Sequence, residues 1–168
     1  DGRDVPPASG PKCVKELCTF MAELGYGELA TFSGRYYAMD RDKRWDRVQL
    51  AYDAICRPAG ACETAASPLE VLNAKHAAGE TDEFVKPVGL VADGGVADGD
   101  VFLCFNFRSD RAREMFEAMS VEPPFETAVR RTPAQCFQFT RYNSAFASPI
   151  IFPPQQLVNG LSEWLSKQ

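Results

Sequence analysis

The sequence predicts an α/β fold, a layered α/β/α domain with a mostly parallel or mixed sheet, from two observations. Several segments carry apolar residues at helical spacing, and short apolar runs of strand character lie between them. Strands that alternate with helices are typical of domains in which helices cover a largely parallel sheet. The 168 residues fit one domain, and a hydrophobic content of 45% with 24% charged residues is typical of a globular chain.

The first half of the chain is expected to contain three helices and one strand. Residues 11–24 and 44–56 each place apolar side chains on one helical face, and residues 28–34 between them read as a short buried strand. A third helix is predicted over residues 68–79, with Ser67 as its N-terminal cap. The predicted apolar faces comprise Val14, Leu17, Cys18, Met21 and Leu24 in the first helix, and Trp45, Val48, Tyr52 and Ile55 in the second.

The second half continues the alternation of strands and helices. Residues 83–95 have strand character, and residues 101–107 form a continuous apolar run, which is typical of a strand covered on both faces. A helix follows over residues 109–119. Near the C-terminus, residues 148–154 predict a strand or an extended linker, and residues 155–167 a last amphipathic helix.

Four arginines follow predicted strands. Arg35 comes directly after the first strand, and Arg41 lies six residues further on. Arg108 follows the apolar run, and Arg111 lies in the first turn of the next helix, whose expected cap is Ser109. Because ligands of open α/β sheets bind beyond the carboxyl ends of the strands, we expect these arginines to converge on one crevice.

Arginine at these positions indicates an anionic ligand. Its guanidinium is planar and always charged, and it holds a carboxylate or phosphate through two hydrogen bonds, whereas lysine offers a point charge. The helix dipole disfavours a cation in the first turn, as at Arg111, unless an anion binds there. Lys43, Arg44 and Arg47 alternate with aspartates, so we expect them mainly to balance those acids in exposed ion pairs.

Arg3 and Asp4 form a third group of charges near the start of the chain. A carboxylate such as Asp4 can hold a substrate hydroxyl or transfer its proton, and the alternative role is to stabilise a turn. His76 is the single histidine and lies in a predicted surface helix. A Ser-His-Asp triad and a histidine-rich metal centre are therefore not expected, and no metal ligand is assigned to this chain.

The composition also bears on the compartment. No apolar run approaches the roughly 20 residues of a membrane-spanning helix, and no signal peptide opens the chain, so a cytoplasmic protein is expected. The six cysteines include no CxxC pair and several lie among apolar residues, which indicates reduced structural thiols. The chain opens without methionine in what reads as a turn, which suggests a part of a longer protein.

Five stretches of the chain, taken in order, resemble the cofactor-independent (2,3-bisphosphoglycerate-independent) phosphoglycerate mutase family. They are DGRDVPP, GRYYAMDRDKRWDR, AGETDEFVKP, GDVFLCFNFRSDRARE and SPIIFPP. The resemblance implies a two-domain enzyme that interconverts 3-phosphoglycerate and 2-phosphoglycerate through a phosphoserine intermediate. It implies no requirement for 2,3-bisphosphoglycerate, and two metal ions, usually Mn²⁺, in a phosphatase-like domain outside this chain.

The resemblance also assigns parts of this chain. Residues 1–154 would be the inserted substrate-binding (transferase) domain without its N-terminal part, and residues 155–168 a linker helix that leads back to the phosphatase-like domain. The family's nucleophilic serine, metal ligands and a substrate-binding histidine and lysine fall on segments that this chain does not contain. The resemblance therefore implies that the chain alone is inactive. Its implied partners are the small-molecule substrate and the phosphatase-like domain, with no nucleic acid and no membrane.

Position by position, the family's substrate-binding residues fall on Arg3, Asp4, Arg35, Arg41, Arg108 and Arg111. The resemblance implies that the arginines clamp carboxylate and phosphate, and that Asp4 holds or deprotonates a glycerate hydroxyl as the one catalytic residue here.

Two alternatives remain open. A stand-alone module could bind small phosphorylated acids without chemistry, in which case the isolated chain would bind phosphoglycerate. A nucleic-acid binder is suggested by arginines interleaved with Tyr36, Tyr37 and Trp45. The sequence pI of about 5.0 argues against it, because a basic footprint is expected of such proteins.

Overall fold

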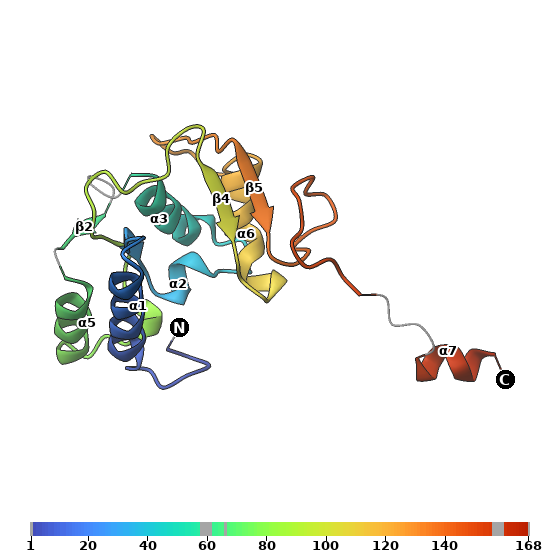
Figure 1. Cartoon of the computed structure of the whole chain (residues 1–168), viewed down its shortest axis with the longest axis horizontal. Coiled ribbons are helices and arrows are strands. Elements are labelled where there is room, and N and C mark those ends of the chain that lie inside the picture. The colour runs from blue at the N-terminus through green and yellow to red at the C-terminus, as the bar shows by residue number, and fades with distance from the viewer. Residues whose placement is uncertain (1, 58–61, 66, 156–159, 168) are drawn as a thin grey trace.

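The computed structural model describes residues 2–57, 62–65, 67–155 and 160–167 (Figure 1). Helices and short strands alternate along the chain, so the α/β class is confirmed. In none of these ranges is a helix both long and apolar enough to span a lipid bilayer. The elements are α1 (Gly10–Leu24), β1 (Thr31–Phe32), α2 (Arg35–Ala38), α3 (Trp45–Cys56), β2 (Glu63–Thr64), α5 (Pro68–Ala77), η1 (Asp82–Phe84), β3 (Val88–Gly89), β4 (Val101–Cys104), α6 (Ser109–Ser120), β5 (Gln135–Gln138) and α7 (Leu161–Ser166).

In the described part of the chain, the strands form two small sheets. One has the order β1-β3-β2, with β1 antiparallel and β2 parallel to β3. The other pairs β4 with β5 in parallel, from Val101 opposite Gln135 to Cys104 opposite Gln138. Ile150, in the predicted C-terminal strand, forms an isolated parallel bridge with Gln138. Parallel and antiparallel pairs therefore occur together, as expected of a mixed sheet.

The longer helices begin and end close to the predicted residues. Gly25 ends α1 in the left-handed conformation (φ 63°), which costs glycine little because it has no Cβ. The hydroxyl of Ser67 accepts the backbone N–H of Glu70 and caps α5 as predicted. The predicted cap of α6 is wrong, because Ser109 is the first helical residue and Arg108, with extended backbone, stands at the cap position.

Three features near α2, η1 and the C-terminus differ from the prediction. The one-turn helix α2 lies where the sequence indicates loop. The helix η1 overlaps the start of the strand predicted over residues 83–95, which is observed only as β3. The predicted helix over residues 155–167 is present as α7 from Leu161 onward, while residues 156–159 lie outside the described residues.

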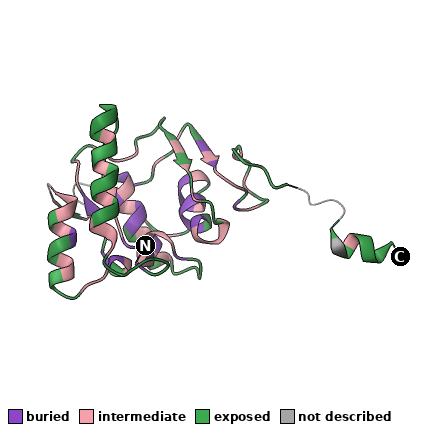
Figure 2. Cartoon of the chain, turned by 60° about the horizontal axis from the view of Figure 1, so that its bottom comes forward, coloured by how far each residue is buried: buried purple, intermediate pink, exposed green. Residues whose placement is uncertain are grey.

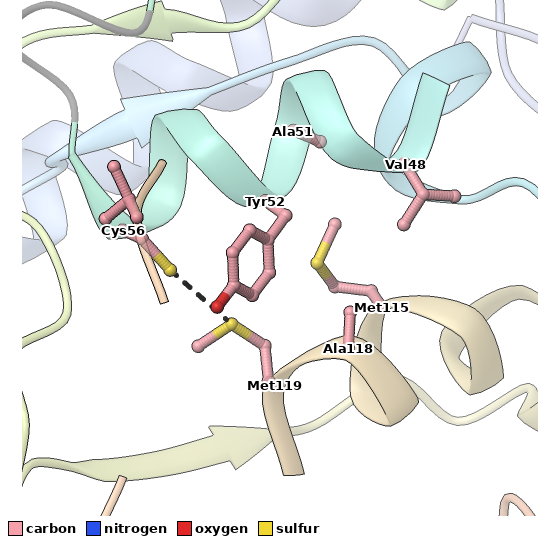
Figure 3. Close-up of a cluster of buried hydrophobic side chains, with 8 residues drawn as sticks. Val48, Ala51, Tyr52, Cys56, Met115, Ala118 and Met119 are labelled. Atoms are coloured by element: carbon pink, nitrogen blue, oxygen red, sulfur yellow. Dashed lines mark hydrogen bonds between the residues drawn. The ribbon is translucent and has the colours of Figure 1, made fainter. Parts of the chain in front are cut away.

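The main hydrophobic core lies between α3 and α6 (Figure 3). Tyr52 of α3 is fully buried and lies among Val48 and Cys56 of its own helix and Met115 and Met119 of α6. A second cluster surrounds Phe116 on the side of α6 that faces β4 and β5. Many of the buried residues, which are purple in Figure 2, lie in α3 and α6. The helix α1 is mostly exposed, shown in green, and contains no buried residue. The packing of α3 on α6 brings the segment before α3, which carries Arg41, next to the start of α6.

The expectation that residues 101–107 form a strand covered on both faces is wrong. The strand ends at Cys104, and its side chains alternate between exposed and half-buried. Phe102 packs toward Phe116 of α6, with ring centroids 6.1 Å apart. The opposite face leaves Leu103 48% exposed and Phe105, beyond the strand, 73% exposed, because among the described residues only the α6 side is covered by a helix.

Candidate functional site

Asp4 lies between two arginines that come from distant parts of the chain. Its Oδ2 accepts a hydrogen bond from Nη1 of Arg35 (3.0 Å) and another from Nη1 of Arg108 (3.2 Å). The Arg35 side chain, at the start of α2, is only 4% exposed, while Asp4 and Arg108 are 48% and 67% exposed. One carboxylate thus joins the N-terminal turn, α2 and the start of α6.

The arginines keep Asp4 ionised. The hydrogen bond from Arg35 is the largest cause that holds the pKa of Asp4 below its ordinary value of 3.8, and it outweighs the opposite effect of burial. The charges of Arg35 and Arg108 act in the same direction. Asp4 is therefore a carboxylate at neutral pH, able to accept a hydroxyl hydrogen bond.

A polar cavity of about 340 Å³ beside Asp4 is lined by six arginines and three acids. The arginines are Arg3, Arg35, Arg41 and Arg111, which are predicted site residues, together with Arg44 and Arg47, and the acids are Asp40, Asp42 and Glu83. Burial is the largest cause that lowers the pKa of Arg111, and the positive charges of Arg35 and Arg41 lower it further. These three guanidinium groups are therefore close enough to repel one another. Like charges at such close quarters repel each other, and an anion in the cavity would relieve that repulsion.

Two contacts fix the arginines of the α2 region against α6. Arg41 donates to Oδ2 of Asp110 in the first turn of α6 (2.9 Å), and Arg111 donates to the carbonyl of Met39 (2.9 Å). The bond from Arg41 is also the main cause that lowers the pKa of Asp110. The structure thus brings together all six predicted site residues, with Arg108 joined to the cavity arginines through Asp4.

The loop that carries Arg41 is held by two buried carboxylates. Asp40 accepts the backbone N–H groups of Asp42 and Arg44, and Glu114 of α6 accepts the N–H of Lys43 (2.9 Å). Lys43 adopts a positive φ of 58°, which a residue with a Cβ rarely takes without such support. Burial raises the pKa of Glu114 above 4.5. Sequence spacing gave no signal for this carboxylate, because it lies far along the chain from the loop it supports.

The cations assigned to local charge balance behave differently from one another. Arg44 pairs with Asp42 (2.6 Å) and Asp40 (3.5 Å), as expected. Arg47 instead places its guanidinium 3.8 Å from the centre of the Tyr36 ring, a cation–π contact on the wall of the same cavity. The prediction that Arg47 mainly balances acids is therefore wrong, because it stacks on an aromatic side chain.

A metal site needs several ligating side chains close together. Among them, no group of three or more histidine, cysteine, aspartate or glutamate side chains could hold a metal ion. His76 lies in α5 with Nε2 2.7 Å from Oδ1 of Asp82. The residues described in this chain therefore do not fit a metal centre.

Known proteins with similar sequences point to one family. The family model described as "BPG-independent PGAM N-terminus" matches residues 1–144. The 2,3-bisphosphoglycerate-independent phosphoglycerate mutase of Onchocerca volvulus is 41% identical over 169 residues, which cover 99% of this chain and 33% of that protein. The corresponding protein of Pseudomonas paraeruginosa is 46% identical over 175 residues, again 99% of this chain and 33% of its own length.

A solved structure agrees with the sequence comparison. A crystal structure of Leishmania mexicana phosphoglycerate mutase at low cobalt concentration matches with a TM-score of 0.83 and 28% identity, over 99% of this chain and 33% of that one. The chain thus spans about a third of the length of the curated relatives that it matches. Since the family model covers residues 1–144, the chain belongs to the family of the BPG-independent phosphoglycerate mutase N-terminus.

Proposed function

We propose that this chain is the substrate-binding part of a metal-dependent phosphoglycerate mutase that interconverts 3-phosphoglycerate and 2-phosphoglycerate through a phosphoserine. The single observation that supports it most strongly is the cavity next to Asp4, where six arginines outnumber three acids in a chain whose net charge is −5. The names of the similar proteins support the same substrate class.

In this proposal the arginines bind the two anionic ends of phosphoglycerate. Arg41, in the loop after α2, and Arg111, in α6, both line the cavity and suit a phosphate and a carboxylate, because a guanidinium binds either one through paired hydrogen bonds. Arg3 and Arg35 add charge that keeps free glycerate bound after its phosphate leaves. Asp4 accepts a hydrogen bond from a glycerate hydroxyl and so orients it.

The division of the chain follows from the same proposal. Residues 1–154 act as the substrate-binding domain, and residues 155–168 lead back to a phosphatase-like domain of the longer protein. That domain supplies the nucleophilic serine and two metal ions such as Mn²⁺, which activate it, without 2,3-bisphosphoglycerate. The described residues of this chain do not fit a metal, so their part is to bind, orient and shield the substrate. The reaction would serve glycolysis and gluconeogenesis in the cytoplasm.

The test compares the full-length protein with this chain alone. Conversion of 3-phosphoglycerate to 2-phosphoglycerate is measured without bisphosphoglycerate, with and without a chelator. We expect the full-length protein to be active, the chelator to abolish activity, and this chain alone to give none. A well-folded, metal-loaded full-length protein that binds phosphoglycerate but does not convert it would replace the mutase proposal with a binding module.

A further inference from the structure

The one-turn helix η1 lies where three other segments of the chain meet. The backbone N–H of Asp82 donates to the carbonyl of Pro7 (2.9 Å), and its Oδ2 accepts the N–H of Gly10 at the start of α1 (2.7 Å). Its Oδ1 lies 2.7 Å from Nε2 of His76 in α5. The side chain of Asp82 is only 4% exposed, so both of its oxygens are used inside the protein.

Three glycines allow the backbone to approach η1 closely. A Cβ built on Gly2 would lie 2.6 Å from the backbone nitrogen of Glu83, and one on Gly34 would lie 2.2 Å from its carbonyl oxygen. A Cβ on Gly10 would lie 2.6 Å from Oδ1 of Asp82. None of these distances is tolerated between real atoms, so each approach depends on the missing side chain.

Two of these glycines, Gly2 and Gly34, belong to segments that carry site residues. Gly2 precedes Arg3 and Asp4, and Gly34 precedes Arg35. The N–H of Gly34 also donates to the carbonyl of Val85, directly after η1 (2.7 Å). The segment that carries Asp4 and the segment that carries Arg35 therefore both pack against η1.

The turn with Arg3 and Asp4 needs such an anchor. Residues 3–8 are exposed throughout, and a segment with few buried contacts is poorly ordered unless it is tied down. Its two ends are held at η1, since Gly2 is buried against Glu83 and the carbonyl of Pro7 accepts the N–H of Asp82. Arg3 adds an ion pair with Glu83 at 3.5 Å.

We propose that Asp82 is a positioning residue, which holds the N-terminal turn against Gly34 so that Asp4 meets Arg35 and Arg108 together. It acts through Asp4 and does not touch the substrate. The proposed effect on catalysis rests on the proposed function, whereas the effect on Asp4 itself does not.

The test uses the full-length protein with Asp82→Ala, Asp82→Asn and the control Asp98→Ala. Asp98 also accepts a backbone N–H, from Thr132 at 2.8 Å, but lies elsewhere. Asp82→Ala removes both side-chain contacts and is expected to lower kcat/KM by about 100-fold, a loss that a displacement of about 1 Å can cause. Asp82→Asn is expected to keep most activity, because its amide oxygen can accept from Gly10 while its amide N–H faces the ring nitrogen of His76.

A double-mutant cycle separates positioning from general destabilisation. If Asp82 acts through Asp4, then Asp82→Ala costs little further activity in an Asp4→Asn background, and the two losses do not multiply. A second readout needs no activity: the pKa of Asp4, followed by carboxyl carbon NMR, should rise toward 3.8 in Asp82→Ala and stay low in Asp98→Ala.

Several outcomes would overturn the proposal. They are multiplicative losses in the cycle, wild-type activity in Asp82→Ala, or an Asp4 pKa that does not respond. If Asp82→Ala does not fold, His76→Ala takes its place in the same cycle. This variant removes the contact with Asp82 but leaves the bond from Gly10, so the expected loss of activity is smaller. Multiplicative losses would again refute the positioning role. Inactive wild-type protein with a responsive Asp4 pKa would refute the proposed function and leave the positioning role supported.

Discussion

Asp4 is held as a carboxylate by Arg35 and Arg108, and this limits its chemistry. A carboxylate with a lowered pKa is a weaker base, so proton abstraction from a glycerate hydroxyl is disfavoured. The same negative charge makes it a strong acceptor of an O–H hydrogen bond. Of the two roles expected from the sequence, the geometry favours holding the hydroxyl over deprotonating it.

The pairing of Asp4 also predicts a pH dependence of stability. A carboxyl whose pKa is lowered on folding stabilises the protein above its unfolded pKa, near 3.8, and this stabilisation is lost as the pH falls through the lowered value. Asp4→Asn should therefore reduce the free energy of unfolding by a constant amount between pH 6 and 8, and by progressively less below about pH 4. Urea unfolding across this range measures it. A difference that persists unchanged at the lowest accessible pH would contradict the pairing.

Arg41 and Lys43 are close in sequence but differ in their expected roles. In the full-length protein, Arg41→Lys is expected to lower kcat/KM by about 10- to 100-fold, since one charged hydrogen bond contributes about 1.5–3 kcal/mol. Lys43→Ala should change it by no more than about twofold, as for an exposed surface charge. Steady-state kinetics with 3-phosphoglycerate compares them, and equal effects would refute the division of roles.

At the residue level, strand ends and motif positions were enough to select the six charged residues that the structure gathers. Residues whose role depends on contacts across the fold were missed. Glu114 supports the loop of Arg41 from a distant helix, and Arg47 stacks on Tyr36, which charge alternation does not reveal. The functional roles of the six residues stay predictions until they are tested by substitution.

At the level of elements, apolar periodicity predicted α1 and α3, which have at least twelve residues over which the spacing can be read. Helix-start signals predicted α5 and α6: Ser67 and Pro68 for the first, and Ser109 and Asp110 for the second. The one-turn helices α2 and η1 have no such pattern, and contacts across the fold hold them, such as the bond from Gly34 to Val85. β5 was missed because its ends, Gln135 and Gln138, are polar, and pairing with β4 rather than hydropathy makes it a strand.

The loop between α2 and α3 depends on a buried acid in α6. Because burial raises the pKa of Glu114, its ionisation opposes folding as the pH rises through the raised value. Glu114→Gln keeps an acceptor for the N–H of Lys43 and removes that opposition. We expect the stability of Glu114→Gln relative to wild type to increase between pH 4.5 and pH 7 in urea unfolding. The exposed Glu16→Gln in α1 is the control, and a relative stability independent of pH would contradict the assignment.

For the whole molecule, the uncovered face of β4 is the most unusual surface feature. Val101, Leu103, Phe105 and Phe107 are each 48% to 78% exposed. A cavity of about 500 Å³ with many apolar lining residues lies between β1 and β4. Apolar surface of this extent is typical of an interface. The sequence predicted the apolar run correctly but not its exposure, because what covers a strand cannot be read from the strand itself.

This surface should make the isolated chain self-associate. The paired substitution Phe105→Ser and Phe107→Ser is expected to lower the average mass in sedimentation velocity toward that of the 18.5 kDa monomer. Tyr26→Ser, which changes an aromatic side chain that is 85% exposed at the end of α1, is the control and should leave the distribution unchanged. A wild-type chain that is monomeric at high concentration would contradict this prediction.

The proposed function requires that the arginine cavity bind 3-phosphoglycerate, and titration calorimetry measures this binding. The full-length protein is compared with Arg111→Ala and with the control Arg130→Ala, whose side chain pairs with Glu122 outside the cavity. We expect saturable binding that weakens by about 10- to 100-fold in Arg111→Ala, as for the loss of a charged hydrogen bond, and is unchanged in Arg130→Ala. Undiminished binding by a folded Arg111→Ala protein would contradict it.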